Sequence, residues 1–233
     1  RGQAMKQKKE LCSRQGVAVE PHRCSDLLDL NGRPILGYSI EYPQIAHPDL
    51  FTECYLNGYY TYCAAKQEEA FIKKLFPALV KRTEGKGFQP SIARSRFRVT
   101  YNKNGLFSTV LEYNLYSAQG EVQAAEQSAI TWDLDRGRSL PLRAMFRTRS
   151  SYRRRILAAA MGLIERNHLE RELSLPEDWR ESLKDNLFQE NFYLTETGVC
   201  VFYPTGMLAG PEQGVVNLLI PLTALQSQLR RKL

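Results

Sequence analysis

The sequence predicts an α+β protein, in which an antiparallel meander sheet carries a long packed helix and a helical insertion precedes the C-terminal strands. Apolar and polar residues alternate in six segments, with the period of half-buried strands. Between residues 50 and 82, apolar residues recur instead at helical spacing. A second helical stretch, at residues 150–186, separates the first strands from the last and is the predicted insertion.

The composition is that of an ordinary globular protein, since 43% of the 233 residues are hydrophobic and 24% are charged. The longest apolar stretch, residues 157–164, is far shorter than the about 20 residues that span a bilayer, so no transmembrane segment is predicted. The five cysteines form no CxxC pair, which argues against a disulfide framework and a zinc ribbon. Together with the lack of an apolar leader, this favours a cytoplasmic location.

The N-terminal residues 1–34 mix charges with glycine and proline and show no steady periodicity. We interpret them as a loosely packed N-terminal arm with one short helix, and residues 35–233 as a single domain. The first strand is predicted at residues 37–45, where alternation continues until Pro43 interrupts the ladder.

The next predicted element is one long amphipathic helix, or two abutting helices. Its apolar positions are Phe51, Tyr55, Tyr59, Tyr62, Ile72, Phe76 and Leu79. The spacing of Tyr55, Tyr59 and Tyr62 favours a stripe that faces the core. The alternative is a sugar-stacking platform, because aromatic faces also bind pyranose rings.

The central strands give the strongest local pattern. Alternation resumes at residues 96–101 and 107–115, and Asn104 and Gly105 supply the residues that a type I′ hairpin turn needs at positive φ. A further strand and a short extended piece follow between residues 130 and 142. Consecutive strands joined in this way predict an antiparallel meander.

The last third of the chain begins with helices. Ser150 or Ser151 is predicted to cap the first of them, and Ser174 and Glu177, spaced as a capping box, predict a second, short one. The remaining predicted elements are three strands and a closing helix, at residues 192–194, 199–203, 216–220 and 222–229.

Several short strings, in this order along the chain, resemble the RsiV-like family, which is built from two adjoining domains of unknown function. The matching strings lie at residues 38–43, 98–102, 106–116, 132–134, 145–146, 192–199, 202–204 and 220–221. The resemblance covers residues 35–225, with family halves of 35–120 and 121–225. It implies a non-enzymatic module that binds or senses a protein or an envelope-derived ligand.

The family includes extracytoplasmic modules, such as the lysozyme-sensing part of the anti-sigma factor RsiV and a domain beside a peptidoglycan deacetylase, so the resemblance implies an exported location as the alternative. This sequence departs from the family pattern in two loops. Their residues are the candidate partner-binding positions Ser117, Gln119, Glu121, Gly206 and Met207. Because these loops differ, and because this protein and lysozyme are both basic, tight binding of lysozyme is not expected.

The sequence shows no recognisable catalytic apparatus. His22, His47 and His168 are scattered, and none has a second ligand at metal spacing, so neither a metal nor a cofactor is predicted. Glu68 and Glu69 lie among lysines on the predicted helix, as on a solvated face. We therefore expect no enzyme; a hydrolase with an unrecognised site is the last alternative.

Arginine is concentrated in two places. Three arginines alternate along one predicted strand and so share a face, and the segment from Arg136 to Arg155 holds eight arginines without Asp or Glu. The candidate anion-binding residues are Arg94, Arg96, Arg98, Arg143, Arg147, Arg149, Arg153, Arg154 and Arg155. The alternative is a solvated surface whose arginines pair with acids elsewhere in the fold.

The formal net charge is +7. If the arginines act as an anion-binding surface, we expect weak, salt-sensitive binding to nucleic acid or to an acidic polymer. The basic tail from Arg230 to Lys232 is interpreted as a frayed helix end without a role in binding.

Overall fold

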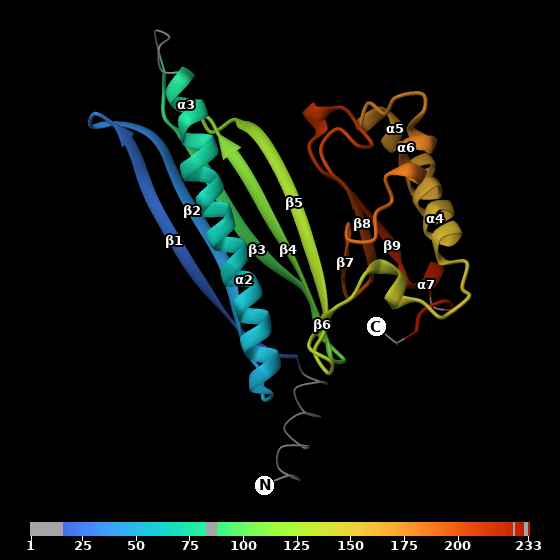
Figure 1. Cartoon of the computed structure of the whole chain (residues 1–233). Coiled ribbons are helices and arrows are strands. Elements are labelled where there is room, and N and C mark those ends of the chain that lie inside the picture. Colours follow the sequence, from blue (N-terminus) through green and yellow to red (C-terminus); the bar gives the residue numbers. More distant parts are fainter. Residues whose placement is uncertain (1–15, 83–87, 226, 231–232) are drawn as a thin grey trace. The chain divides into compact units, whose positions relative to one another are not determined.

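A computed structural model describes residues 16–82, 88–225, 227–230 and 233 of the chain (Figure 1). The chain divides into two compact units. Unit 1 contains Val17–Phe97 and Leu111–Ala125, and unit 2 contains Arg98–Val110 and Glu126–Leu233. The predicted single domain over residues 35–233, with its two family halves, stays a prediction.

A six-stranded sheet runs through the first part of the chain. In order across the sheet, its strands are β1 (Ala18–Leu30), β2 (Arg33–Ala46), β3 (Ser91–Lys103), β4 (Leu106–Tyr116), β5 (Val122–Asp133) and β6 (Arg138–Ser139). The mixed α+β class is confirmed, and β3 to β6 are neighbours in chain order, as a meander requires. β2 and β3, however, pair in parallel.

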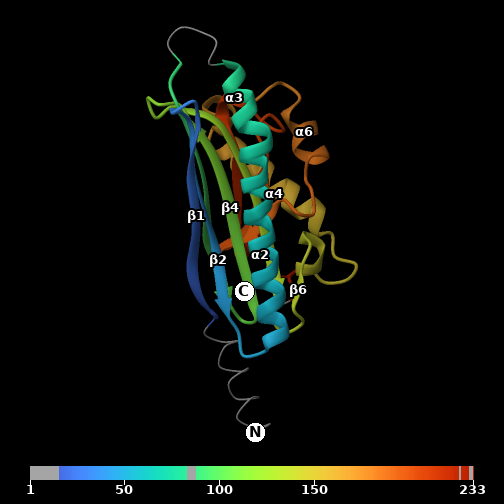
Figure 2. The same ribbon diagram turned by 60° about the vertical axis from the view of Figure 1, so that its left-hand side comes forward.

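The parallel pair differs from the predicted all-antiparallel sheet because a helix connects its two strands. The connection consists of α2 (Leu50–Ala70), a π-helical turn (Phe71–Leu75) and α3 (Phe76–Arg82). Such a crossover returns the chain to the end of the sheet at which β2 began, so the next strand runs in the same direction. The predicted long helix is confirmed, and it lies along one face of the sheet (Figure 2).

β1 corrects the predicted N-terminal arm, because residues 18–30 form a strand that pairs antiparallel with β2. Its side chains are mostly exposed, which explains why no alternating pattern marks it. Pro43 does not end β2 either, since it lies opposite Pro21. Two prolines cannot exchange hydrogen bonds, so they form a non-hydrogen-bonded pair, which the ladder tolerates. Residues 1–15 of the predicted arm lie outside the described residues.

The core of unit 1 lies between α2, α3 and the sheet. Asp49 begins α2 by accepting hydrogen bonds from the backbone N–H and the hydroxyl of Thr52, at 3.0 and 2.7 Å. Further along the helix, Phe71 contacts the rings of Tyr38 on β2 and Tyr113 on β4, each at 5.5 Å between centroids. These packed rings fix the helix against the sheet.

The predicted core-facing stripe of α2 is wrong. Tyr55 and Tyr62 are 53% and 61% exposed, whereas Leu56 and Tyr60 are fully buried. Both sets have helical spacing, so periodicity could not decide which faces the sheet, and aromatic character suggested the wrong one. The exposed face includes a parallel pair of rings, Phe51 and Tyr55, with centroids 6.4 Å apart. Sugar stacking on this face stays a hypothesis.

Unit 2 adds a three-stranded antiparallel sheet and several short helices. Its strands are β7 (Phe192–Leu194), β8 (Gly198–Tyr203) and β9 (Val216–Pro221), in that order. Its helices are α4 (Tyr152–Arg166), α5 (Leu169–Glu172), α6 (Trp179–Asp185) and α7 (Leu222–Leu225), with 3-10 turns at Leu142–Met145 and Pro211–Gln213. Ile156, Ala160 and Ile164 on one face of α4 are fully buried in the core of this unit. The predicted helical insertion and the three strands after it are confirmed.

The turns show where sequence signals succeeded and failed. Asn104 and Gly105 have φ of 56° and 71°, which confirms the type I′ turn between β3 and β4. The predicted capping box is wrong, because Ser174 has φ of 46° and α6 begins only at Trp179. The closing helix is shorter than predicted, since α7 ends at Leu225.

Within the described part of the chain, no helix is long and apolar enough to cross a membrane. The four described cysteines are free thiols. Cys54 on α2 is exposed, whereas Cys200 on β8 is buried.

Candidate anion-binding site

The segment between β6 and α4 gathers arginines into a pocket of about 470 Å³ in unit 2. Its lining residues are Pro141, Arg143, Ala144, Phe146, Arg147, Thr148, Arg149, Ser150, Tyr152, Arg153 and Arg230. The structure therefore brings together four of the nine predicted anion-binding arginines, Arg143, Arg147, Arg149 and Arg153. We call this set, with Arg230, the arginine pocket.

Arg230 reaches the pocket because the C-terminal segment pairs with the chain just before α4. Leu229 forms a β-bridge with Phe146. On either side of it, the N–H of Arg147 donates to the carbonyl of Gln228 at 2.8 Å, and the N–H of Arg230 donates to the carbonyl of Met145 at 2.9 Å. The Nε of Arg147 also donates to the carbonyl of Leu229, at 3.2 Å. Sequence reasoning dismissed Arg230 as part of a frayed helix end. No local signal could have revealed a contact across 82 residues of chain.

Gln189 fixes the two sides of the pocket to each other. Its Oε1 accepts a hydrogen bond from the backbone N–H of Arg143 at 2.9 Å, and its Nε2 donates to the hydroxyl of Tyr152 at 3.1 Å. The ring of Tyr152 stacks on Phe146, with centroids 4.8 Å apart and an angle of 16° between the planes. These contacts hold the pocket in shape without using the guanidinium groups of Arg143 and Arg149.

Arg153 is anchored at the opposite side. Its two Nη atoms donate to the backbone carbonyls of Lys184, at 2.6 Å, and Leu187, at 3.2 Å. Lys184 lies in the last turn of α6, where free carbonyls attract a cation. These carbonyls orient the guanidinium without neutralising its positive charge.

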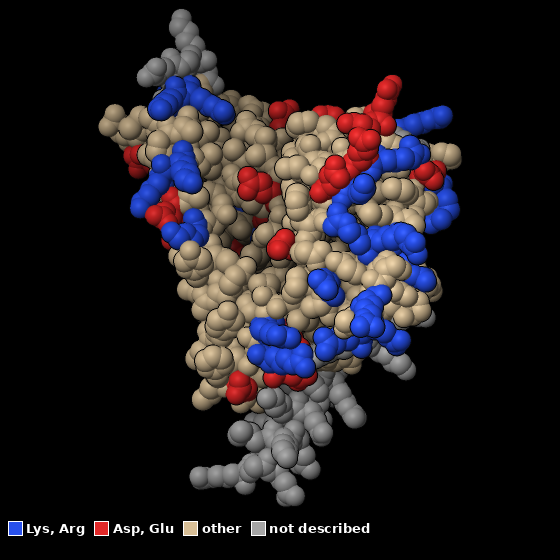
Figure 3. Space-filling view, turned by 45° about the vertical axis from the view of Figure 1, so that its right-hand side comes forward, with Lys and Arg blue, Asp and Glu red and all other residues tan. Residues whose placement is uncertain are grey.

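The arginines of the pocket have no carboxylate partner within ion-pair distance among the described residues. The ion pairs of unit 2 join other groups, such as Arg136 with Asp133 at 3.7 Å and Arg180 with Glu165 at 2.7 Å. For these arginines, the alternative interpretation of pairing with acids elsewhere in the fold gains no support. Over unit 2, Figure 3 shows basic side chains in an extended group. Uncompensated positive charge in a concave site attracts anions.

The N-terminus of α4 adds to this positive potential. The predicted cap position Ser151 is confirmed, but its side chain makes no capping bond, and no acidic residue occupies the first turn. The Oγ of Ser150, which lines the pocket, is buried and has no hydrogen-bond partner among the described residues. Free N–H groups and a free hydroxyl are donors that an anion can use.

The other predicted arginines lie elsewhere. Arg94, Arg96 and Arg98 share the exposed side of β3, as the alternation predicted. Arg94 lies over the ring of Tyr116 at 5.6 Å, and Arg98 over that of Tyr193 at 5.7 Å. Such cation–π contacts occupy one face of each guanidinium.

Arg154 and Arg155 lie in the first turn of α4, outside the pocket. Arg154 lines a neighbouring groove, and Arg155 is an exposed residue of the helix. Sequence reasoning could not separate them from Arg153, because consecutive helical residues point in different directions.

The two candidate partner-binding loops belong to different units. In unit 1, the N–H of Ser117 donates to the carbonyl of Glu121 at 2.9 Å, and Gln119 donates to the side chain of Gln89 at 2.7 Å. In unit 2, Gly206 has φ of 79°, and Met207 is 43% exposed. Both are tight surface turns.

Among the described residues, no three His, Cys, Asp or Glu side chains gather in a way that could hold a metal ion. His47 is buried at the start of α2, where its Nδ1 accepts the backbone N–H of Asp49 at 3.1 Å, which is a structural contact.

Comparisons with known proteins show the fold. No family model and no curated protein matches the sequence. A crystal structure of a DUF3298 family member from Bacteroides fragilis superimposes with a TM-score of 0.61 and 17% identity, over 94% of this chain and 96% of that one. A crystal structure of a DUF3298 family protein from Pseudomonas aeruginosa superimposes with a TM-score of 0.59 and 14% identity, over 92% of this chain and 94% of that one.

The chain therefore has the fold of DUF3298 proteins. That family is related to the RsiV-like domains, so the resemblance found in the sequence is supported at the level of the fold. At these identities the likeness carries no residue of a binding site from one protein to another.

Proposed function

We propose that this protein is a non-enzymatic binding module whose arginine pocket takes an anionic ligand. The observation that carries this proposal is the convergence of five arginines on one pocket without a carboxylate partner among the described residues. A structural role would be expected to leave the guanidinium groups paired with acids. A binding role explains why their charge is left uncompensated.

The shape of the site favours a compact anionic group over a rigid polyanion. A carboxylate or phosphate can enter a pocket and receive paired hydrogen bonds from planar guanidinium groups. Double-stranded DNA would instead contact an extended basic surface through many phosphates, with affinity that falls steeply as salt rises. The sequence suggested nucleic acid or an acidic polymer as the anionic ligand; we favour a compact anionic group over both.

The test is calorimetric titration with inorganic pyrophosphate and with a random DNA duplex, each at about 50 and 200 mM salt. We expect pyrophosphate to bind at both salt concentrations and the duplex to bind weakly, at the lower one alone. Absence of pyrophosphate binding at low salt would contradict the proposal. Lysozyme serves as a further titrant, and we expect no tight binding because both proteins are basic.

A further inference from the structure

An apolar groove of about 600 Å³ adjoins the arginine pocket. Ser150, Tyr152 and Arg153 line both, so the two are adjacent. Beyond these shared residues the groove follows α4, with Leu157, Ala158 and Met161 along it. The site as a whole therefore has a cationic end and an apolar end.

The apolar end arises from the spacing of residues on α4. Leu157 and Met161 are one helical turn apart and point to the same side, as does the small side chain of Ala158. Leu157 and Met161 are half-buried and Ala158 is exposed, so the groove is open to solvent. From Arg153 to Met161 the helix rises about 12 Å, which is the length of a medium-length alkyl chain.

Cationic side chains border the groove as well. Arg153, Arg154 and Lys184 line it, and the hydrogen bonds from Arg153 to the carbonyls of Lys184 and Leu187 tie α4 to the end of α6. This link holds the two walls of the groove together. A ligand that lies in the groove therefore has positive charge at its sides and carbon atoms beneath it.

We propose that pocket and groove form one site for a monomeric amphiphilic anion, such as a long-chain carboxylate or an alkyl phosphate. Its charged head would lie in the arginine pocket and its chain along Leu157, Ala158 and Met161. A fully polar anion leaves the groove empty, and a neutral lipid leaves the arginines without a partner. This inference rests on the proposed function, because it names the ligand class of the same pocket.

The experiment compares inorganic phosphate, butyl phosphate, octyl phosphate and neutral octyl glucoside, each below its micelle concentration, by calorimetry. Each CH₂ that becomes fully buried raises affinity about fourfold. We expect octyl phosphate to bind at least about tenfold more tightly than butyl phosphate, with partial burial of the chain. Octyl glucoside should not bind. Equal affinity for the two alkyl phosphates would overturn the inference.

Two sets of variants separate the inference from the proposed function. Ala158→Gln places an amide in the groove at an exposed helical position, and it should lower octyl phosphate affinity about tenfold while inorganic phosphate binds as before. Ala65→Gln, at an exposed position of α2, is the matched control and should change neither. Arg143→Gln with Arg149→Gln should weaken both ligands. If that double variant changes neither affinity, the proposed function itself fails.

A vesicle arm distinguishes a monomeric ligand from a membrane surface. Vesicles of phosphatidylglycerol present the same charge and chains in a bilayer, where a single chain cannot leave to occupy the groove. We expect binding to octyl phosphate that vesicles do not reproduce. Binding to the vesicles without binding to octyl phosphate would overturn the proposal in favour of a membrane-binding surface.

Discussion

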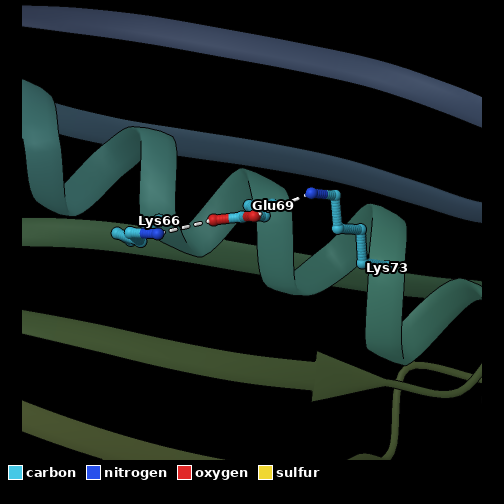
Figure 4. A network of polar contacts seen from close by, with 3 residues as sticks. All are labelled: Lys66, Glu69 and Lys73. Carbon is cyan, nitrogen blue, oxygen red and sulfur yellow. Dashed lines mark hydrogen bonds and ion pairs between the residues drawn. The ribbon is translucent and has the colours of Figure 1, made fainter.

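Basic side chains are placed differently in unit 1 and unit 2. In unit 1, Lys66 of α2 and Lys73 of the π-helical turn after it lie on either side of Glu69, each 2.8 Å from one of its carboxylate oxygens (Figure 4). Hydrogen bonds from these two lysines lower the pKa of Glu69 to about 2. This is a solvated face, as the sequence predicted, and its cations have a carboxylate partner. In the arginine pocket of unit 2, no described carboxylate lies within ion-pair distance of the arginines.

The arginines of β3 provide an intermediate case. Arg94 and Arg96 project from one side of a strand, about 7 Å apart, and Arg94 rests on a tyrosine ring. They share a face but do not converge on a common point. Charge density along a sequence therefore does not determine whether the charged side chains meet in the fold. The path of the backbone around a pocket does, and it is set by contacts such as those of Gln189.

We expect the largest effect from a substitution on the buried face of α2 in unit 1, compared with one on its exposed face. Tyr60→Ala should lower the free energy of unfolding by about 3 kcal/mol or more, because the side chain is fully buried. Tyr55→Ala, on the exposed face, should change it by less than about 0.5 kcal/mol. Urea denaturation followed by circular dichroism measures both. Similar losses for the two variants would contradict the observed orientation of the helix.

A smaller effect is expected from removing the residue that positions the arginine pocket. Gln189→Leu deletes the hydrogen bonds to the Arg143 N–H and the Tyr152 hydroxyl, so it should lower pyrophosphate affinity about tenfold without removing any charge. Gln189→Glu keeps the acceptor but adds a negative charge beside the pocket, and should weaken binding further. Unchanged affinity in both variants would show that the pocket needs no such support.

The smallest effect concerns pH and the buried thiol of unit 2. Burial raises the pKa of Cys200 from 9.0 to about 11. The neutral thiol therefore stabilises the folded state fully below about pH 9, and this contribution is lost as the pH rises towards 11. Cys200→Ala should flatten the decline in unfolding free energy over this range, by about 1 kcal/mol. Exposed Cys54 serves as the control for removing a thiol, since Cys54→Ala should change the free energy of unfolding by less than about 0.5 kcal/mol.

Much of the fold follows from local pattern, and the failures share a cause. Alternation and the Asn104-Gly105 turn predicted β3 and β4 because those signals lie within a few residues. The strand β1 escaped notice because an edge strand with exposed side chains needs no apolar period. The stripe of α2 was placed on Tyr55 because spacing fits any face of a helix equally well.

Local sequence pattern also predicted part of the candidate site. The run from Arg136 to Arg155 stood out by its lack of acids, and four of its arginines line the pocket. Arg230 and Gln189 could not be found in this way, since tertiary contacts far apart in the sequence bring them there. The same limit applies to the apolar groove, whose wall includes Lys184 of α6.

The pyrophosphate affinity of two matched double variants tests whether the arginine pocket binds the anion. Arg143→Gln with Arg149→Gln removes two positive charges from the arginine pocket, and Arg94→Gln with Arg96→Gln removes two from the exposed side of β3. Since a hydrogen bond to a charged group contributes about 1.5 to 3 kcal/mol, we predict a loss of about 100-fold or more in the first variant and less than about threefold in the second. Equal losses would show that overall charge, and not the pocket, binds the anion.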